Sequence, residues 1–241
     1  MLRLRILLLA VTVMCVTELA SQAQGTTSVH KFTDLDFGAG NTEGTLVVSL
    51  NIDKGLGQKR KIIIGFGGRF NAYLGKNQYF VTAPAKLTSG STGPGVIFKE
   101  NIEANMDTFL VKSAQLNSLN LFLTLGYNLS ERLMVRFNID LIGFSFGKSV
   151  TGNYINGTQG KMEGASPTSF NLLLISDNDR GSLNSQFFAR YLLSEKWGIK
   201  GGIQFLFSEY TTDTEVQQFP EPNDRFRNKS LLFSAGVSFK L

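Results

Sequence analysis

The feature that most constrains the fold is a strict two-residue alternation of apolar and polar side chains. Across 117–129 the odd positions are apolar from Leu119 onward, while the even positions are small or polar apart from Phe122. This period is typical of a β-strand with one apolar face. The same pattern returns at 46–52, 62–74, 133–141, 187–193, 197–207 and 231–241, and more weakly at 29–39. The sequence therefore predicts about eight strands, with a count of ten left open.

The connections between these strands alternate in length. Tight connections at 54–58, 130–131 and 194–196 are separated by long ones at 76–114, 148–182 and 211–228, which are rich in Gly, Ser, Thr, Asn and Pro. Short periplasmic turns and long extracellular loops are the pattern of an outer-membrane barrel. Two tight turns also share a Tyr-x-Leu-Ser-Glu-basic-apolar phrase, which predicts a periplasmic aromatic girdle of Tyr127, Tyr191 and Trp197.

Alternation alone leaves open which face points outward. A secreted lipocalin-like barrel also alternates, but with apolar residues inside and polar residues outside. Here the polar face consists mostly of Gly, Ser, Asn and Gln, and charged residues make up only 18% of the chain. Small side chains suit a crowded interior better than a surface in water. We therefore predict an all-β fold, a transmembrane antiparallel up-and-down β-barrel of about eight strands spanning 24–241, with both termini periplasmic.

The first 23 residues predict a secretory signal peptide. Arg3 and Arg5 precede an apolar run, and Ser21-Gln22-Ala23 offers a cleavage site after Ala23. The only cysteine, Cys15, lies inside this segment. The mature chain is thus expected to contain no disulfide and no cysteine-based catalytic or metal site.

The signal peptide, the strands and the C-terminus together resemble a small bacterial outer-membrane β-barrel protein of the OmpA/OmpX-like class, especially its Bacteroidetes-type porin-family relatives. Ser234-x-Gly236-x-x-Phe239-x-Leu241 is similar to the C-terminal insertion signal of that class, with Leu241 in place of the terminal aromatic residue. The resemblance implies the outer membrane of a Gram-negative bacterium. It also implies contact with outer-membrane lipids and lipopolysaccharide, and with the barrel assembly machinery during insertion.

Candidate catalytic and metal-binding residues are sparse. His30 is the only histidine, and it begins the first predicted strand near the periplasmic end, away from an extracellular cleft. With no second histidine and no cysteine in the mature chain, we expect no metal, no cofactor and no catalytic residues. The net charge of +5 includes no basic stripe with interleaved aromatics, so nucleic acid is not an expected partner.

The inward-facing charges are more informative. An eight-stranded barrel is just wide enough for side chains to fill, so charges inside it should pair with one another rather than line a pore. We expect a structural network with a surplus of cations, while Phe144 and Phe146 on the polar parity indicate either a bulge near Gly143 or a cap on the interior. The expected network consists of Asp34, Asp36, Lys61, Arg69, Arg136, Asp140, Arg190 and Lys200.

Function is then expected to reside in the long loops. Tyr79-Phe80-Val81, Val96-Ile97-Phe98 and Phe109-Leu110-Val111 make the first loop apolar enough to extend the strands or to contact an unidentified protein partner. The predicted role is non-enzymatic, either structural or adhesive, or as a subunit of an outer-membrane complex. The alternatives are an outer-leaflet lipid-modifying enzyme and a secreted lipocalin-like barrel that binds a small ligand.

Overall fold

The computed structural model describes residues 29–92, 95, 98–156, 159–174 and 176–241. The expected signal peptide and Val96-Ile97 lie outside the described residues. The elements in chain order are the strands and short helices β1 (Val29–Ala39), β2 (Glu43–Leu56), β3 (Ile62–Thr82), α2 (Ala85–Thr88), η2 (Glu103–Asn105), β4 (Thr108–Asn128), β5 (Leu133–Phe146), β6 (Val150–Asn156), β7 (Gln159–Pro167), β8 (Phe170–Leu172), η3 (Ser176–Asn178), β9 (Asn184–Leu192), β10 (Trp197–Thr212) and β11 (Arg225–Lys240).

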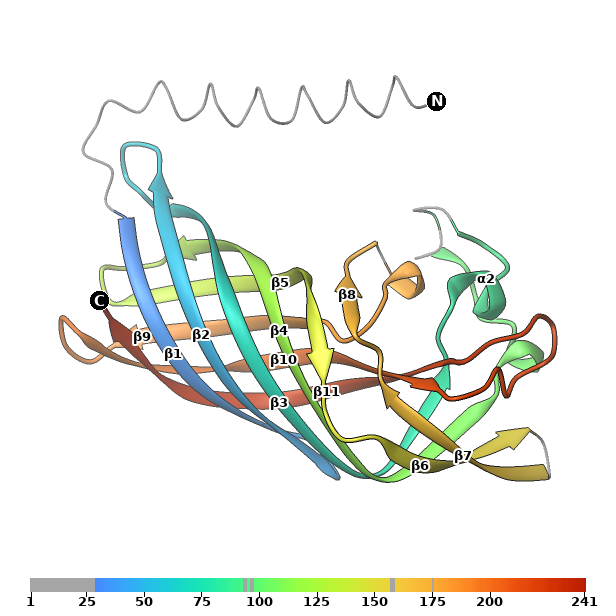
Figure 1. The fold of residues 1–241 in the computed structure, drawn as a ribbon. Helices are drawn as coiled ribbons and strands as arrows, with labels where there is room; N and C mark the ends of the chain where they lie inside the picture. The colour runs from blue at the N-terminus through green and yellow to red at the C-terminus, as the bar shows by residue number, and fades with distance from the viewer. Residues whose placement is uncertain (1–28, 93–94, 96–97, 157–158, 175) are drawn as a thin grey trace.

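Eight strands close into a ring, which we call the large ring. The antiparallel pairings run β1–β2–β3–β4–β5–β9–β10–β11, and β11 pairs back to β1. All eight predicted strands are present, including the weakly patterned first one. The tight turns and the C-terminus gather at one end of the ring, while α2, β6, β7 and β8 lie beyond the other end (Figure 1).

A second, smaller ring continues from the end opposite the tight turns. The connection between β1 and β2 spans only 40–42, so beyond it β11 pairs directly with β3, Phe226 opposite Thr82. On the other side, β6 and β7 form a hairpin inserted between β4 and β10. The pairings β3–β4–β6–β7–β10–β11–β3 thereby close a six-stranded small ring. The predicted long connection 148–182 thus contains three strands, and the first predicted loop begins and ends with extensions of β3 and β4, to Thr82 and from Thr108.

Irregularities in pairing change which face of a strand is buried. Asn77 of β3 has a positive φ of 52°. On its two sides Lys76 lies opposite Ser113 and Gln78 lies opposite Val111, so the β3–β4 register is the same before and after it. Below this point odd residues of β3 such as Tyr73 are buried, and above it even residues such as Phe80 are buried. On β4 the buried face changes at the same level, between Val111 and Ala114, so the two strands switch faces together without a change of register and both serve two rings.

A register shift between β4 and β5 explains the two phenylalanines on the polar parity. Between Leu121 and Phe122 of β4 the partner changes from Ile142 to Asp140, so Leu141 is the extra residue of β5. Phe144 and Phe146 consequently point outward, with 62% and 53% of their surface exposed. The expected bulge is confirmed and lies at Leu141, two residues before Gly143. The alternative that Phe144 and Phe146 cap the interior is wrong.

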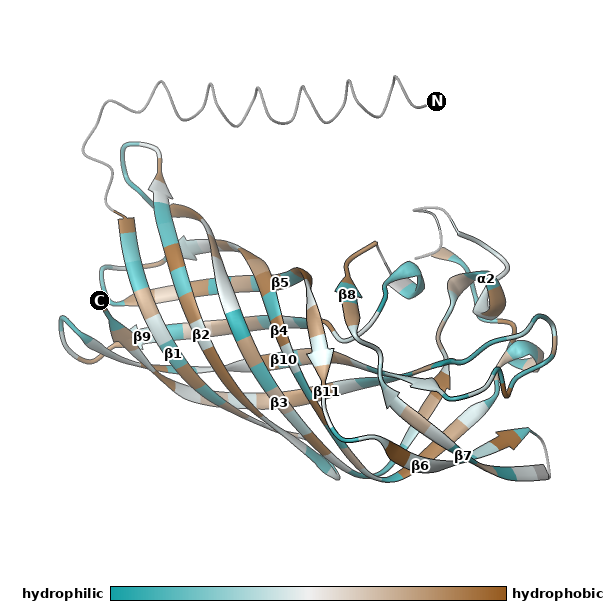
Figure 2. Cartoon of the chain, viewed as in Figure 1, coloured by the Kyte–Doolittle hydropathy of each residue, from teal (hydrophilic) through white to brown (hydrophobic). Residues whose placement is uncertain are grey.

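The two rings have opposite polarity. The large ring is apolar outside, and hydropathy alternates along its strands (Figure 2), with Phe37, Leu50, Phe66, Leu121, Leu125, Phe187, Ile199 and Phe233 among its exposed side chains. The small ring is apolar inside, and its outward positions include the exposed Lys112 and Thr151. Its interior, with the adjoining layer of the large ring, is filled by Tyr73, Phe80, Phe109, Val111, Ala114, Leu116, Tyr154, Ala165, Leu206, Tyr210, Phe226 and Leu232.

Ring closure between the first and last strands can be tested by crosslinking. Leu35 lies opposite Val237, and opposed residues of an antiparallel pair are about 4.5–5.5 Å apart, within disulfide range. In a Cys15→Ser background, Leu35→Cys with Val237→Cys should form an intramolecular disulfide on mild oxidation, measured by thiol labelling. Leu35→Cys with Phe233→Cys, offset by about 13 Å along the strand, is the matched control and should stay reduced. Equal crosslinking in both variants would contradict the register.

Candidate functional site: the charge network inside the large ring

Asp34 of β1 is the most connected carboxylate inside the large ring. Its Oδ2 accepts hydrogen bonds from Arg190 NH2 at 2.7 Å and Lys200 Nζ at 2.9 Å, and also from Asn51 Nδ2 at 3.0 Å. Ser238 Oγ donates to the other oxygen, Oδ1, at 2.5 Å. These partners stand on β2, β9, β10 and β11. Charge-assisted hydrogen bonds are the strong ones, so Asp34 ties the weakly patterned first strand to the rest of the ring.

Two further carboxylates complete the layer nearest the tight turns. Asp36 Oδ2 accepts from Lys200 Nζ at 2.7 Å. Asp53 Oδ2 accepts from Arg136 Nε at 3.2 Å and lies 4.0 Å from Arg190 NH1. The cations also rest against aromatic faces, since Arg190 Cζ is 3.9 Å from the ring centre of Phe32 and Lys200 Nζ is 4.1 Å from that of Phe188. Such contacts stabilise cations removed from water.

Arg69 and Asp140 form a separate pair closer to the small ring. Their NH1 and Oδ1 atoms are 3.5 Å apart, and both side chains are fully buried. Asp140 Oδ2 also accepts from Asn120 Nδ2 at 2.7 Å and from the backbone N–H of Asn184 at 2.9 Å. Arg69 Cζ lies 4.7 Å from the ring centre of Phe122. Phe122, the one apolar residue on the otherwise polar face of 117–129, therefore packs against a buried guanidinium group.

The charges of this network balance. The described interior holds four buried cations, Arg69, Arg136, Arg190 and Lys200, and four buried aspartates, Asp34, Asp36, Asp53 and Asp140. The expected cation surplus is wrong for two reasons. Lys61 is exposed beyond the start of β3, with its Nζ 5.9 Å from the ring centre of Tyr127. Asp53, which the sequence analysis did not include, supplies the fourth carboxylate. Extending the alternation of 46–52 by one residue would have placed Asp53 on the inner face of the strand.

The predicted aromatic girdle lies beside the tight turns. Tyr127, Tyr191 and Trp197 are outward-facing and between 42% and 54% exposed. Trp197 packs edge-on against Phe239, with ring centres 4.9 Å apart. His30 is part-exposed near the start of β1, opposite Asp53 on β2, at the end of the molecule away from the small ring.

Two residues of the predicted insertion signal have distinct environments. A Cβ atom at Gly236 would lie 2.2 Å from Asp36 Oδ1 and 2.4 Å from the backbone oxygen of Leu35, so only glycine lets β11 approach β1 this closely. Leu241 is the last residue and is 67% exposed, and its backbone N–H donates to the carbonyl of Lys31 at 3.0 Å. Gly236 therefore has a packing role in ring closure.

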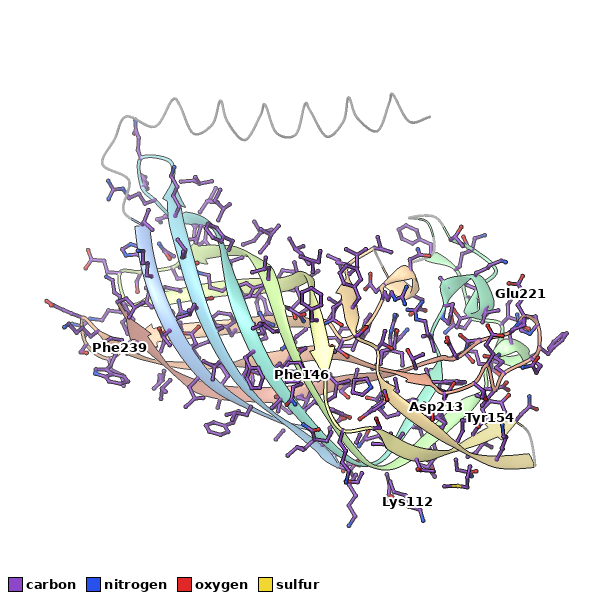
Figure 3. All side chains as sticks on the ribbon, viewed as in Figure 1. Lys112, Phe146, Tyr154, Asp213, Glu221 and Phe239 are labelled. Atoms are coloured by element: carbon purple, nitrogen blue, oxygen red, sulfur yellow. The ribbon has the colours of Figure 1, made fainter. Side chains whose placement is uncertain are left out.

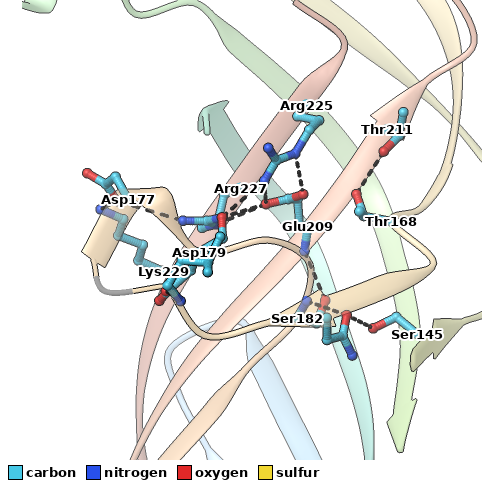
Figure 4. A network of polar contacts seen from close by, with 12 residues as sticks. Ser145, Thr168, Asp177, Asp179, Ser182, Glu209, Thr211, Arg225, Arg227 and Lys229 are labelled. Carbon is cyan, nitrogen blue, oxygen red and sulfur yellow. Dashed lines mark hydrogen bonds and ion pairs between the residues drawn. The ribbon is translucent and has the colours of Figure 1, made fainter. Parts of the chain in front are cut away.

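A second ion network lies on the outward side of β10 and β11, where the two rings meet (Figure 4). Glu209 is fully buried and pairs with Arg225 Nε at 2.8 Å and Arg227 NH2 at 2.7 Å. Lys229 Nζ lies 2.5 Å from Asp177 Oδ1, and Arg227 NH1 lies 3.8 Å from the same oxygen. Sequence reasoning missed this network because it assigned 211–228 to a loop. It fastens the chain around η3 onto the strands.

The aromatic side chains inside the small ring have partners for their hydroxyl groups. Tyr154 donates to Asp107 Oδ2 at 2.5 Å, and Tyr210 donates to the carbonyl of Gln115 at 3.0 Å. Burial and the hydrogen bond to Asp107 raise the pKa of Tyr154 to about 12, so this phenol stays protonated near neutral pH. The interior of the small ring is thus mainly apolar, and the hydroxyl groups of these two tyrosines are hydrogen-bonded.

The described residues contain no cluster of histidine, cysteine, aspartate and glutamate suited to a metal ion. Helices long and apolar enough to cross a membrane are likewise absent from the described part of the chain. The four buried aspartates of the large ring pair with its four buried cations.

No known family profile and no curated protein matches the sequence. Among solved structures, Neisserial surface protein A is 8% identical, covers 89% of this chain and 99% of its own, and superposes with a TM-score of 0.38. The outer membrane protein Ail of Yersinia pestis is 7% identical, covers 89% of this chain and 100% of its own, and has a TM-score of 0.39. A major outer membrane protein of Thermus thermophilus is 10% identical, covers 89% of this chain and 100% of its own, and has a TM-score of 0.37. At TM-scores this low, the likeness carries no argument about function.

The connectivity of Asp34 can be tested against that of its neighbour Asp36. Asp34→Asn weakens the pairing of Arg190 as well as Lys200, whereas Asp36→Asn leaves Lys200 its contact with Asp34. Breaking a buried ion pair typically costs about 3–5 kcal/mol, so Asp34→Asn should lower the free energy of unfolding by about that amount. Asp36→Asn should cost about 1–2 kcal/mol. Urea unfolding of the refolded protein measures both, and an equal loss would show that Asp34 is not the centre of the network.

Proposed function

We propose that this chain is a non-enzymatic outer-membrane β-barrel protein of a Gram-negative bacterium, and that its pore is closed. The observation that carries this proposal is the reversal of polarity between the two rings. A surface lined by Leu50, Phe66, Leu121 and Phe187 is stable in hydrocarbon, whereas the small ring has the apolar interior of a protein in water. The boundary between the rings then corresponds to the membrane surface.

The length of the apolar surface agrees with this placement. Along β3 the outward positions run from Ile62 to Leu74 without a charged residue. A tilted strand needs about 9–11 residues to cross the hydrocarbon core. The edge of the apolar surface beside the tight turns carries Tyr127, Tyr191 and Trp197. Aromatic side chains favour this interfacial position. The tight turns would face the periplasm and the small ring the cell exterior.

The alternative of a secreted lipocalin-like barrel has less support. Such a barrel keeps apolar residues inside to hold a ligand and polar residues outside. Here four ion-paired aspartates fill the large ring, and the exposed face is apolar. An outer-leaflet lipid-modifying enzyme is the other alternative. His30, its only histidine candidate base, is near the tight turns, at the end opposite the small ring.

A role in contact with other molecules fits the extramembrane part. Phe98, Met162 and Phe219 expose 85%, 62% and 69% of their surface there. Apolar side chains displayed on a rigid support suit adhesion or assembly with a protein partner. Membership of the Bacteroidetes-type OmpA/OmpX-like class, handling by the barrel assembly machinery and contact with lipopolysaccharide belong to the same proposal.

A matched pair of arginine substitutions tests the membrane boundary. Leu121 of the large ring and Met162 of the small ring are outward-facing and 60% and 62% exposed. In a bilayer, Leu121→Arg should lower the free energy of unfolding by about 2–4 kcal/mol, because arginine near the midplane is costly. Met162→Arg should change it by less than about 0.5 kcal/mol. Urea titration in phospholipid vesicles gives both values. A soluble barrel would tolerate both substitutions alike, which would sink the proposal.

The closed interior predicts the electrical behaviour. The buried charges of the large ring lie between two apolar layers, one made by Phe32, Met134 and Leu192 and the other by the core of the small ring. Planar-bilayer recordings of the folded protein should therefore show no large steady conductance. Asp34→Asn with Asp36→Asn should either leave the bilayer silent at reduced stability or produce small, unsteady openings. A stable ohmic pore in the unsubstituted protein would contradict a closed interior.

A further inference from the structure

Three exposed lysines stand on neighbouring strands at the edge of the apolar surface. Lys76 of β3 pairs in register with Ser113, the neighbour of Lys112 on β4. Lys148 follows β5, and its backbone N–H donates to Gln115 Oε1 of β4 at 3.1 Å. All three lysines are exposed. Figure 3 shows Lys112 at the junction of the two rings, pointing away from the strands.

The three ammonium groups have no acidic partner among the described residues. The described lysines that form ion pairs are Lys86, Lys161, Lys200 and Lys229. The acidic residue that lines the same surface depression as Lys76 and Lys112 is Glu43. Its Oε2 already accepts from Tyr73 at 2.8 Å and from Ser230 at 2.6 Å, on the inner side of the strands. Within the described part of the chain, a patch of three unpaired positive charges results.

The surroundings of this patch indicate what it binds. The outward Leu74 and Phe146 each lie two residues before a lysine, Lys76 and Lys148 respectively. They are 61% and 53% exposed and belong to the apolar surface of the large ring. Asn117 lies opposite Phe146, and Ser113 supplies a hydroxyl between the lysines. A ligand that fits this arrangement carries phosphate at the level of the lysines and acyl chains alongside the apolar side chains.

We propose that Lys76, Lys112 and Lys148 bind the phosphate groups of an anionic lipid in the outer leaflet. This inference rests on the proposed membrane placement. Lysine stems can lie along apolar surface while their ammonium groups reach the polar interface. Each basic side chain near an anionic membrane surface contributes about five-fold in affinity, so three together contribute roughly 100-fold. The site would orient the barrel and fix its depth at the level of Asn77, where the two rings join.

The experiment uses the folded protein in phosphatidylcholine vesicles that carry increasing amounts of diphosphorylated lipid A. Binding to the folded state alone raises the urea midpoint with lipid concentration, which gives an apparent affinity. We expect the triple variant Lys76→Gln, Lys112→Gln and Lys148→Gln to lose at least tenfold in that affinity. The corresponding triple arginine variant should keep it. The matched control, Lys59→Gln with Lys61→Gln and Lys196→Gln, removes the same charge at the tight-turn end and should also keep it.

Further measurements distinguish lipid phosphate from soluble phosphate, and failure of the lysine site from failure of the membrane placement. Dephosphorylated lipid A should give no midpoint shift in any variant. A shift retained by the glutamine triple overturns the site, and full competition by inorganic phosphate at equal concentration shows a site for a soluble anion and overturns the lipid assignment. Failure of every variant to fold into vesicles of either composition would refute the membrane placement itself.

Discussion

The Asp34 carboxylate is the interaction on which closure of the large ring depends most. It joins β1 to side chains of β2, β9, β10 and β11 through four hydrogen bonds. β1 has few alternating apolar residues of its own, so its position is fixed by its two backbone ladders and by this buried charge. Because an unpaired charge in a closed interior is costly, each of the four aspartates requires its cation, and the cations in turn fix the strands that bear them.

The closed interior and the apolar exterior are consequences of one arrangement. Charges and amides occupy the large ring between two apolar layers, so most of the apolar side chains of its strands lie on the outside. The backbone irregularity at Asn77 ends that arrangement by moving the alternate face of β3 inward, so that Phe80 joins Phe109 and Phe226 in a core. A local backbone irregularity at one level of β3 and β4 therefore reverses inside and outside while the register of the two strands is kept. The lysine patch lies at this reversal.

The small ring supports the segments beyond the large ring with paired strands, which the sequence alone does not reveal. Its strands are continuations of β3, β4, β10 and β11, to which the β6–β7 hairpin adds. The Glu209 network then holds the chain around η3 against β10 and β11. Residues such as Phe98 and Phe219 are thus presented from a supported surface. A contact made by them would require less ordering on binding than one made by a free loop.

The sequence by itself determined the eight strands of the large ring, the face of each strand that is apolar and the inward position of seven of the eight buried charges, because alternation is local and every second residue shares a face. Tertiary structure alone decided the pairing of Asp53 with Arg136, the small ring, and the network around Glu209. These depend on contacts between strands distant in the sequence, on the backbone irregularity at Asn77 and on the single-residue bulge at Leu141, which reverse parity without any change in composition. A period of two residues records which side chains share a face, but the partner across the ring is set only when the ring closes.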